Sequence, residues 1–170
     1  YSADNGLAET QHVFLSGNNL PERFSTGFQI AELGFGTGLN LLVALAAWRK
    51  SGAKGVLYFT SFEAFPLTPE QMIIAHQAFP ELKEIATELA SLWGNTITLP
   101  DLKFDLILGD ARDTLPAWLK KADAWFLDGF SPTKNPELWE PTLMADVAQH
   151  TKSGGSCATY TAAGFVRRSL

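Results

Sequence analysis

Short apolar segments alternate with segments of helical character along this chain, and this alternation restricts the fold more than any other feature. We predict strands at 28–33, 56–62, 104–108, 124–127 and 156–160, and helices at 38–50, 69–79, 113–121 and 138–149. Thr68 directly before Pro69 is a typical N-cap followed by the proline that favours the first helical position. Strands and helices that alternate at these lengths indicate an α/β fold with a doubly wound, mostly parallel sheet and right-handed crossovers.

Composition limits the class of protein. The 170 residues are 46% hydrophobic and 18% charged, which is typical of one folded globular domain. We expect no membrane span and no signal peptide. The single cysteine, Cys157, excludes an internal disulfide framework and favours a cytoplasmic location, and with only three histidines we expect no metal site. The net charge of −5 gives no sign of a nucleic-acid-binding surface.

The segment A-E-L-G-F-G-T-G-L-N, residues 31–40, lies between the first predicted strand and the first predicted helix. The dinucleotide fingerprint G-x-G-x-x-G would need its third glycine at Leu39 or Leu41, so both registers fail. The segment instead has the pattern E-x-G-x-G-x-G, formed by Glu32, Gly34, Gly36 and Gly38. This pattern is associated with S-adenosylmethionine in doubly wound methyltransferases: glycines let the backbone approach the ligand, and Glu32 could pair with its amino group. Any tight strand-to-helix turn also favours glycine.

Carboxylates also follow the next two strands. Glu63 ends the second strand in S-F-E-A-F-P, where its side chain could accept both hydroxyls of a ribose. Asp110 ends the third strand in L-I-L-G-D-A, where it could meet the amino group of an adenine. Each could instead be an ordinary solvated carboxylate. Because ligands bind beyond the carboxyl ends of parallel strands, acidic residues at three successive strand ends predict a nucleoside cofactor.

The fourth strand leads into D-A-W-F-L-D-G-F-S-P-T-K-N-P-E-L-W, residues 123–139. An aspartate directly after an apolar strand is poorly accommodated unless it has a function, so we interpret Asp128 as functional. The loop after it would lie beside the transferable methyl group, where an acceptor must bind. We interpret Trp139 as a core residue.

Several segments together resemble one family. A-E-L-G-F-G-T-G-L-N, S-F-E-A-F-P-L, L-G-D-A-R-D-T-L-P, W-F-L-D-G-F-S-P-T-K-N-P-E-L-W and A-A-G-F-V-R-R look like the methyltransferase domain of the MnmC family. The family consists of bifunctional tRNA 5-methylaminomethyl-2-thiouridine biosynthesis proteins. The resemblance implies a Rossmann-like class I fold and methyl transfer from S-adenosylmethionine to the amine of 5-aminomethyl-2-thiouridine, at the wobble position of a tRNA. It also implies a fused or partner FAD-dependent oxidoreductase domain.

The resemblance assigns site residues by motif. It assigns Glu32, Gly34, Gly36 and Gly38 to the cofactor loop. Glu63 falls on the ribose site, and Asp110 and Ala111 fall on the adenine site. The residues that fall on the acceptor side are Asp128, Phe130, Pro132, Lys134 and Asn135. An alkylamine has a pKa of about 10.4, so it arrives protonated and non-nucleophilic at neutral pH. We therefore expect Asp128 to orient the amine; whether it also takes the proton stays open, because a carboxylate beside the amine first favours the ammonium form. Phe130 could stack on a flipped-out base, and Lys134 could meet a phosphate.

We expect residues 1–170 to form a single methyltransferase domain that is incomplete at both ends and truncated after the fifth strand, without the FAD-dependent domain. The dispersed basic residues and acidic net charge count against a tRNA partner unless the attached domain supplies phosphate contacts. Two alternatives remain: a methyltransferase for a small-molecule or protein amine, and a non-catalytic cofactor-binding module. An NAD-dependent oxidoreductase is disfavoured by Leu39 and Leu41.

Overall fold

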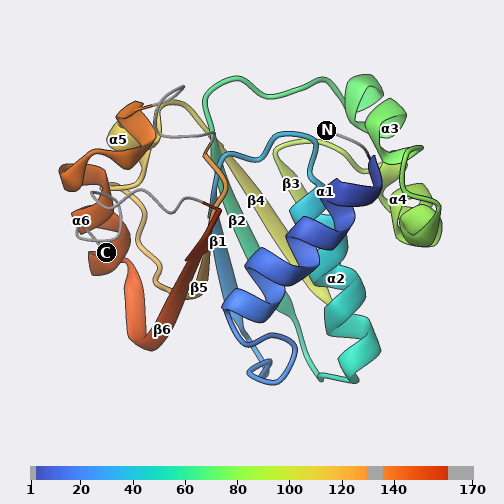
Figure 1. Ribbon diagram of the computed structural model, residues 1–170, viewed down its shortest axis with the longest axis horizontal. Coiled ribbons are helices and arrows are strands. Elements are labelled where there is room, and N and C mark those ends of the chain that lie inside the picture. Colours follow the sequence, from blue (N-terminus) through green and yellow to red (C-terminus); the bar gives the residue numbers. More distant parts are fainter. Residues whose placement is uncertain (1–2, 130–135, 161–170) are drawn as a thin grey trace.

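The computed structural model of the chain describes residues 3–129 and 136–160, which form a six-stranded sheet with helices on both faces (Figure 1). The strands are β1 (Gln29–Leu33), β2 (Leu57–Glu63), β3 (Thr96–Leu99), β4 (Leu102–Leu108), β5 (Ala122–Leu127) and β6 (Thr151–Thr159). Their order is β3-β4-β2-β1-β5-β6, and every neighbouring pair is parallel except β3 and β4. The predicted doubly wound, mostly parallel sheet is confirmed.

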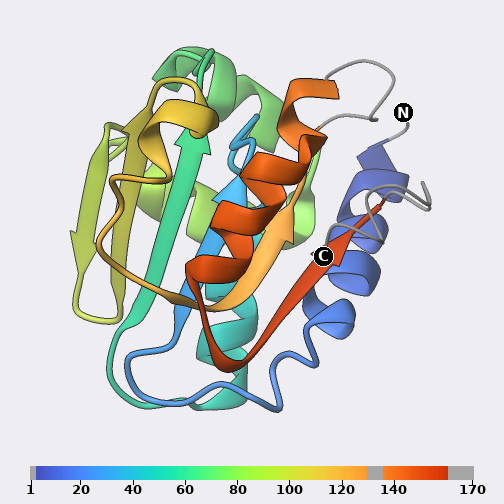
Figure 2. The same cartoon turned by 90° about the vertical axis from the view of Figure 1, so that its left-hand side faces the viewer.

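Helices cover the two faces unequally. One face carries α1 (Ala3–Glu9), η1 (Thr10–Ser16), α2 (Leu39–Ser51), α3 (Pro69–His76), η2 (Pro80–Leu82) and α4 (Lys83–Ala90). The other carries α5 (Ala111–Thr114), η3 (Pro136–Trp139) and α6 (Pro141–Gln149), which face the viewer in Figure 2. No helix in residues 3–129 and 136–160 combines the length and apolar character needed to cross a membrane.

Side chains alternate between two hydrophobic clusters, one on each face of the sheet. Along β1, Ile30 points into the larger cluster beneath α2, whereas Ala31 and Leu33 point into the smaller one beneath α5 and α6. Because side chains of a strand alternate, Glu32 shares the face of Ile30 and points toward α2. This face of the sheet therefore presents one carboxylate from its central strand to the first helix.

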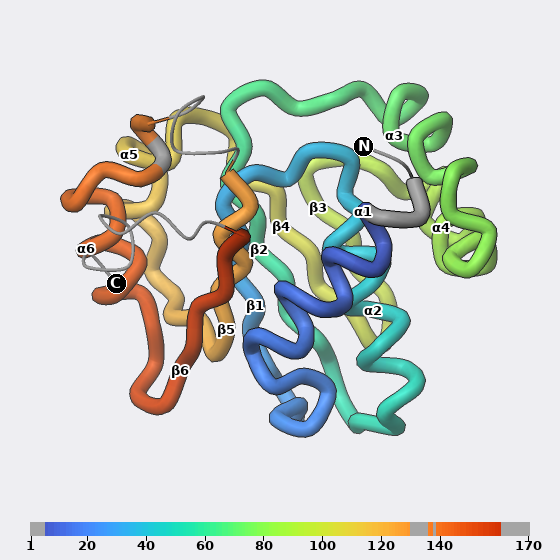
Figure 3. The backbone as a smooth tube through the Cα atoms, in the orientation of Figure 1, coloured from blue at the N-terminus to red at the C-terminus, as the bar shows by residue number. Residues whose placement is uncertain are grey.

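The N-terminal segment forms a continuous helix, α1 and η1, that packs along α2 and β6 (Figures 1 and 3). Phe14 anchors it on the sheet, with its ring stacked 5.2 Å from that of Phe126. After the helix in the chain, the Arg23 guanidinium donates to the carbonyl oxygens of Asp123 in β5 and Gly154 in β6, at 3.0 and 3.1 Å. These contacts fix the helix beside the last strand, a placement that the sequence analysis did not predict.

Several predicted boundaries are wrong. The predicted helix at 113–121 is only one turn, α5, because Pro116 cannot continue it. The predicted helix at 138–149 is divided into η3 and α6, and Pro141 begins the second. The sheet has six strands rather than five: the antiparallel β3 was missed, and β6 begins at Thr151 and ends at Thr159 instead of spanning 156–160. The helix start at Thr68 is confirmed, with a complete capping box.

Candidate functional site

The glycine loop, residues 34–38, follows β1 and passes over the carboxyl ends of its neighbouring strands. Gly34 has φ +86°, and a Cβ there would lie 3.1 Å from the carbonyl oxygen of Asp128. Gly38 has φ +79° and caps α2, and a Cβ there would lie 2.9 Å from the Phe35 ring. These two glycines are required by backbone conformation and close packing together.

Gly36 differs from its neighbours. Its φ is +54°, but a Cβ at this position would meet no described atom within 4 Å. The residue is exposed, so the side of the loop that it presents is open. A backbone with this conformation and no side chain allows a ligand to approach closely, which fits the predicted cofactor loop.

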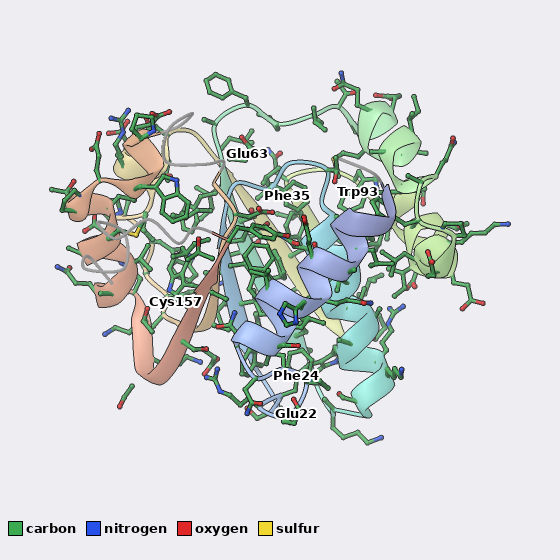
Figure 4. The ribbon with its side chains drawn as sticks, in the orientation of Figure 1. Glu22, Phe24, Phe35, Glu63, Trp93 and Cys157 are labelled. Carbon is green, nitrogen blue, oxygen red and sulfur yellow. The ribbon has the colours of Figure 1, made fainter. Side chains whose placement is uncertain are left out.

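Two buried aromatic side chains fix the glycine loop to the rest of the fold: Phe35, within the loop, and His76 of α3. Phe35 is 4% exposed, and its ring stacks 5.0 Å from that of Phe104. His76 of α3 places Nε2 2.6 Å from the carbonyl oxygen of Thr37. Burial lowers the pKa of His76, which favours the neutral ring that donates from Nε2 to this carbonyl. Figure 4 shows Phe35 below Glu63 at the upper end of the sheet, with Trp93 to the right.

Glu63 ends β2 beside the glycine loop. Its Oε2 accepts hydrogen bonds from the backbone N–H groups of Phe35 and Gly36, at 2.9 and 3.2 Å. Its Oε1 accepts from the N–H of Phe65, at 2.8 Å. The carboxylate is therefore held against the loop at the strand end where the sequence predicts a ribose site.

Asp110 is engaged locally in this structure. It caps α5 by accepting from the N–H of Arg112 at 2.9 Å, and the Arg112 guanidinium pairs with its carboxylate at 2.6 Å. These bonds lower the pKa of Asp110, so it is ionised at neutral pH. Ala111, the adjoining residue of the predicted adenine site, is buried at the start of α5.

Glu32 does not face the open side of the loop, as its expected pairing with a ligand amino group would require. Its side chain has no exposed surface, and its two oxygens accept from Asn40 and Ser61, both at 2.7 Å. Burial raises its pKa well above the ordinary value, and the nearby charge of Asp128 raises it further. The reason is the alternation of β1, which turns this residue toward α2. Glu32 therefore contacts Asn40 and Ser61 rather than the open side of the loop.

Asp128 lies at the end of β5, next to the glycine loop. Its backbone N–H donates to the carbonyl of Leu33 at 3.1 Å, and its Oδ2 accepts from the Asn40 side chain at 2.8 Å. Burial raises its pKa from 3.8 to about 7; the Asn40 hydrogen bond opposes this rise and the charge of Glu9 adds to it. A carboxylate of this kind exchanges a proton near neutral pH.

The structure thus brings together the glycine loop, Glu63 and Asp128, with Asp110 one strand further along the sheet. The predicted acceptor residues Phe130, Pro132, Lys134 and Asn135 lie outside the described residues. Asn40, Ser61 and His76 also lie at this site and were not predicted from the sequence. Asn40 could have been found as a polar residue in the first turn of an otherwise apolar helix. Within residues 3–129 and 136–160, no cluster of three or more metal-ligating side chains occurs.

Comparison with known proteins decides the family. A family model described as S-adenosyl-L-methionine-dependent methyltransferase matches residues 76–170, more than half of the chain. The chain belongs to this methyltransferase family. Proteins named tRNA 5-methylaminomethyl-2-thiouridine biosynthesis bifunctional protein MnmC, from Hahella chejuensis and Aliivibrio fischeri, are both 45% identical to it over the whole chain. The chain spans 29% and 28% of their lengths.

Solved structures agree with this membership. The crystal structure of MNMC2 from Aquifex aeolicus matches the methyltransferase with a TM-score of 0.77 and 29% identity, over 96% of this chain and 53% of that one. A type I restriction-modification methyltransferase subunit from Streptococcus thermophilus matches with a TM-score of 0.51 and 14% identity, over 96% of this chain and 36% of that one, and supports the fold alone. The resemblance and the Rossmann-like methyltransferase fold stated from the sequence are confirmed.

Proposed function

We propose that this methyltransferase transfers a methyl group from S-adenosylmethionine to the amine of 5-aminomethyl-2-thiouridine at the wobble position of tRNA. The observation that carries the proposal is the placement of Asp128, held by Asn40 beside the glycine loop, in a chain 45% identical throughout to proteins named for this biosynthesis. The geometry supplies a proton acceptor next to a cofactor loop, and the relatives suggest the amine.

The described residues fit the cofactor. We assign the glycine loop to its methionine and ribose parts, because the face at Gly36 is open, and Glu63 to its ribose hydroxyls. Asp110 and Ala111 are assigned to the adenine, which requires the Asp110 carboxylate to keep one acceptor position free beside Arg112. When bound, S-adenosylmethionine supplies a methyl group on a positively charged sulfur, which keeps the electron pair of the broken S–C bond.

The amine must lose a proton before it can react. Asp128 Oδ2 is bonded to Asn40, and no described side chain bonds Oδ1, so we assign Oδ1 to accept a hydrogen bond from the substrate ammonium. With a pKa of about 7, Asp128 holds a proton far better than an ordinary aspartate, so it takes one proton from the ammonium and leaves a lone pair for the methyl group. Alignment of that lone pair supplies most of the acceleration.

The acceptor and partner assignments belong to the same proposal. We assign Phe130, Pro132, Lys134 and Asn135 to the flipped-out wobble uridine and its backbone. A fused or partner FAD-dependent oxidoreductase domain would fit relatives more than three times as long as this chain, and would add phosphate contacts to the few that a chain of net charge −5 can offer. Because the substrate is tRNA, we propose the cytoplasm as the compartment.

Methyl transfer to defined tRNA tests the substrate. We expect the full-length protein to transfer radiolabelled methyl groups to tRNA that carries 5-aminomethyl-2-thiouridine, and none to tRNA that already carries the methylated base. Equal transfer to a free alkylamine would favour a small-molecule methyltransferase. Binding of S-adenosylhomocysteine without transfer to any acceptor would favour a non-catalytic module.

Replacing Gly36 with alanine tests the cofactor loop. The added methyl group meets no described atom, so it costs about 1 kcal/mol of stability through its left-handed backbone alone. If the cofactor occupies the open side, the methyl clashes with it, and S-adenosylhomocysteine affinity falls by roughly tenfold or more in calorimetric titration.

Gly52→Ala is the matched control for this variant. Gly52 has φ +73°, ends the same helix α2 that follows the loop, and a Cβ there would also meet no described atom within 4 Å. It should lose a similar amount of stability and keep its affinity. Equal affinities of the two variants would place the cofactor away from Gly36.

A further inference from the structure

The side-chain amide of Asn40 joins two carboxylates. Its Nδ2 donates to Oε1 of Glu32 at 2.7 Å and to Oδ2 of Asp128 at 2.8 Å, which uses both of its hydrogens. Asn40 is 3% exposed and Glu32 has no exposed surface. Two acidic groups, one fully buried and one partly buried, are thus linked through one buried neutral donor.

The charges around this bridge are all of one sign. The groups that act on the two carboxylates are Glu9 at the end of α1 and Glu63 at the end of β2, and each raises the pKa of one of them. Among the described residues, neither Glu32 nor Asp128 forms an ion pair with a lysine, arginine or histidine. Among the described residues no cation offsets these two neighbouring charges, which favours a neutral form of one of the two carboxyl groups.

The hydrogen bonds favour Glu32 as the neutral group. Its Oε2 lies 2.7 Å from the hydroxyl of Ser61, which can accept as well as donate, so a proton on Oε2 has a partner. Its other oxygen, Oε1, can accept from Asn40 whether the carboxyl group is protonated or ionised. Asp128 is the less buried of the two, and within residues 3–129 and 136–160 its Oδ1 has no side-chain hydrogen-bond partner.

We propose that Asn40 is a positioning residue, which orients Asp128 toward the acceptor amine, and that Glu32 permanently holds the site's buried proton. Asp128 is then the one group of the pair that exchanges a proton with substrate. This inference rests on the proposed function for the identity of the amine, but the protonation of Glu32 is a property of the protein alone.

Infrared spectroscopy tests the proton on Glu32. At pH 8 the exposed carboxyl groups are ionised, so a protonated Glu32 is expected to give a carboxylic acid band that disappears in Glu32→Gln. Glutamine is a suitable replacement because its oxygen can accept from Asn40 and its amide can donate to Ser61. Absence of the band in the wild-type protein at pH 8 would overturn the proton assignment.

Asn40→Ala tests the positioning role by a readout that needs no substrate. Loss of the Asn40 hydrogen bond removes a contact that lowers the pKa of Asp128, so the infrared midpoint of Asp128 should move to higher pH. Methyl transfer should fall roughly a hundredfold, with little change in S-adenosylhomocysteine affinity. Glu32→Gln should keep the wild-type midpoint of Asp128, because the glutamine amide is as neutral as the protonated glutamate, and this variant tests the proton assignment even if Asn40→Ala does not fold.

Asn18→Ala is the matched control. Asn18 is equally buried and also donates twice, to the carbonyl oxygens of Phe14 and Trp125, but it contacts no carboxylate. It should lose stability without moving the midpoint. An unmoved midpoint in Asn40→Ala, with loss of stability like that of Asn18→Ala, would reduce Asn40 to a structural residue. Failure of the wild-type protein to methylate tRNA would overturn the proposed function while leaving the infrared results valid.

Discussion

Asp128→Asn is expected to abolish methyl transfer while leaving S-adenosylhomocysteine binding nearly unchanged. Asparagine keeps the shape of the side chain and can still accept from Asn40 through its oxygen, but it cannot take a proton from the substrate ammonium. Loss of a general base costs about 10²–10⁴-fold in rate. Single-turnover transfer to aminomethyl tRNA and calorimetric titration measure the two effects on the same preparation.

Asp123→Asn is the control for this variant. Asp123 lies at the other end of β5, where it accepts from the backbone N–H of Gln29 at 2.8 Å and pairs with Lys152. Its replacement should leave transfer intact. A loss of S-adenosylhomocysteine affinity in Asp128→Asn as large as its loss of rate would reassign Asp128 to the cofactor site.

Asp128→Asn should also change how the free energy of unfolding depends on pH. The pKa of Asp128 is about 7 in the folded chain against an ordinary value of 3.8, so folding takes up a proton between these values. The stability that this proton contributes is complete below pH 3.8 and is lost as pH rises through 7. Asp128→Asn should therefore be the more stable protein at pH 8, by on the order of 2–4 kcal/mol, and the difference should shrink at pH 5. Urea denaturation at both pH values measures it.

The sheet could be predicted because several of its strands contain short apolar runs that are recognisable in the sequence. β1, β2 and β5 are largely buried on both faces; the glycine loop follows β1, and Glu63 is the last residue of β2. β3 is only four residues long and its first and third side chains are exposed, so no apolar run marks it. The first half of β6 reads T-K-S-G-G, which resembles a loop; only Thr151 in it pairs with β5 before a register shift, and regular pairing begins at Ser156.

The positions of the candidate site residues could be predicted in part. We expected Asp128 and Glu63 near one another because the carboxyl ends of parallel strands meet at one edge of the sheet. The contacts of Glu32 could not be read from its motif. The alternation of β1 turns its side chain toward α2, where the amide of Asn40, eight positions later in the chain, donates a hydrogen bond to it. The link from Asn40 to Asp128 spans 88 positions and exists only in the folded chain.

Phe35→Ala is expected to cause the largest loss of stability among substitutions in the glycine loop. The ring is 4% exposed, stacks on Phe104 at 5.0 Å and meets Trp93 edge-on at 6.2 Å. Removal of a buried phenylalanine side chain costs about 3–5 kcal/mol, because it leaves a cavity as well as lost apolar burial. Urea denaturation of the two proteins at one pH gives the difference.

Phe65→Ala is the control for Phe35→Ala. It separates the effect of losing the buried ring under the glycine loop from the effect of losing any aromatic ring near the site. Phe65 lies two residues after Glu63 and is 88% exposed, so its truncation should change stability by less than about 0.5 kcal/mol. In Phe35→Ala the loop loses the ring against which Gly38 is packed, and S-adenosylhomocysteine affinity should fall together with stability. If affinity stays at the wild-type value while stability falls, the N–H bonds to Glu63 and the Thr37 contact with His76 suffice to shape the loop, and Phe35 serves the core alone.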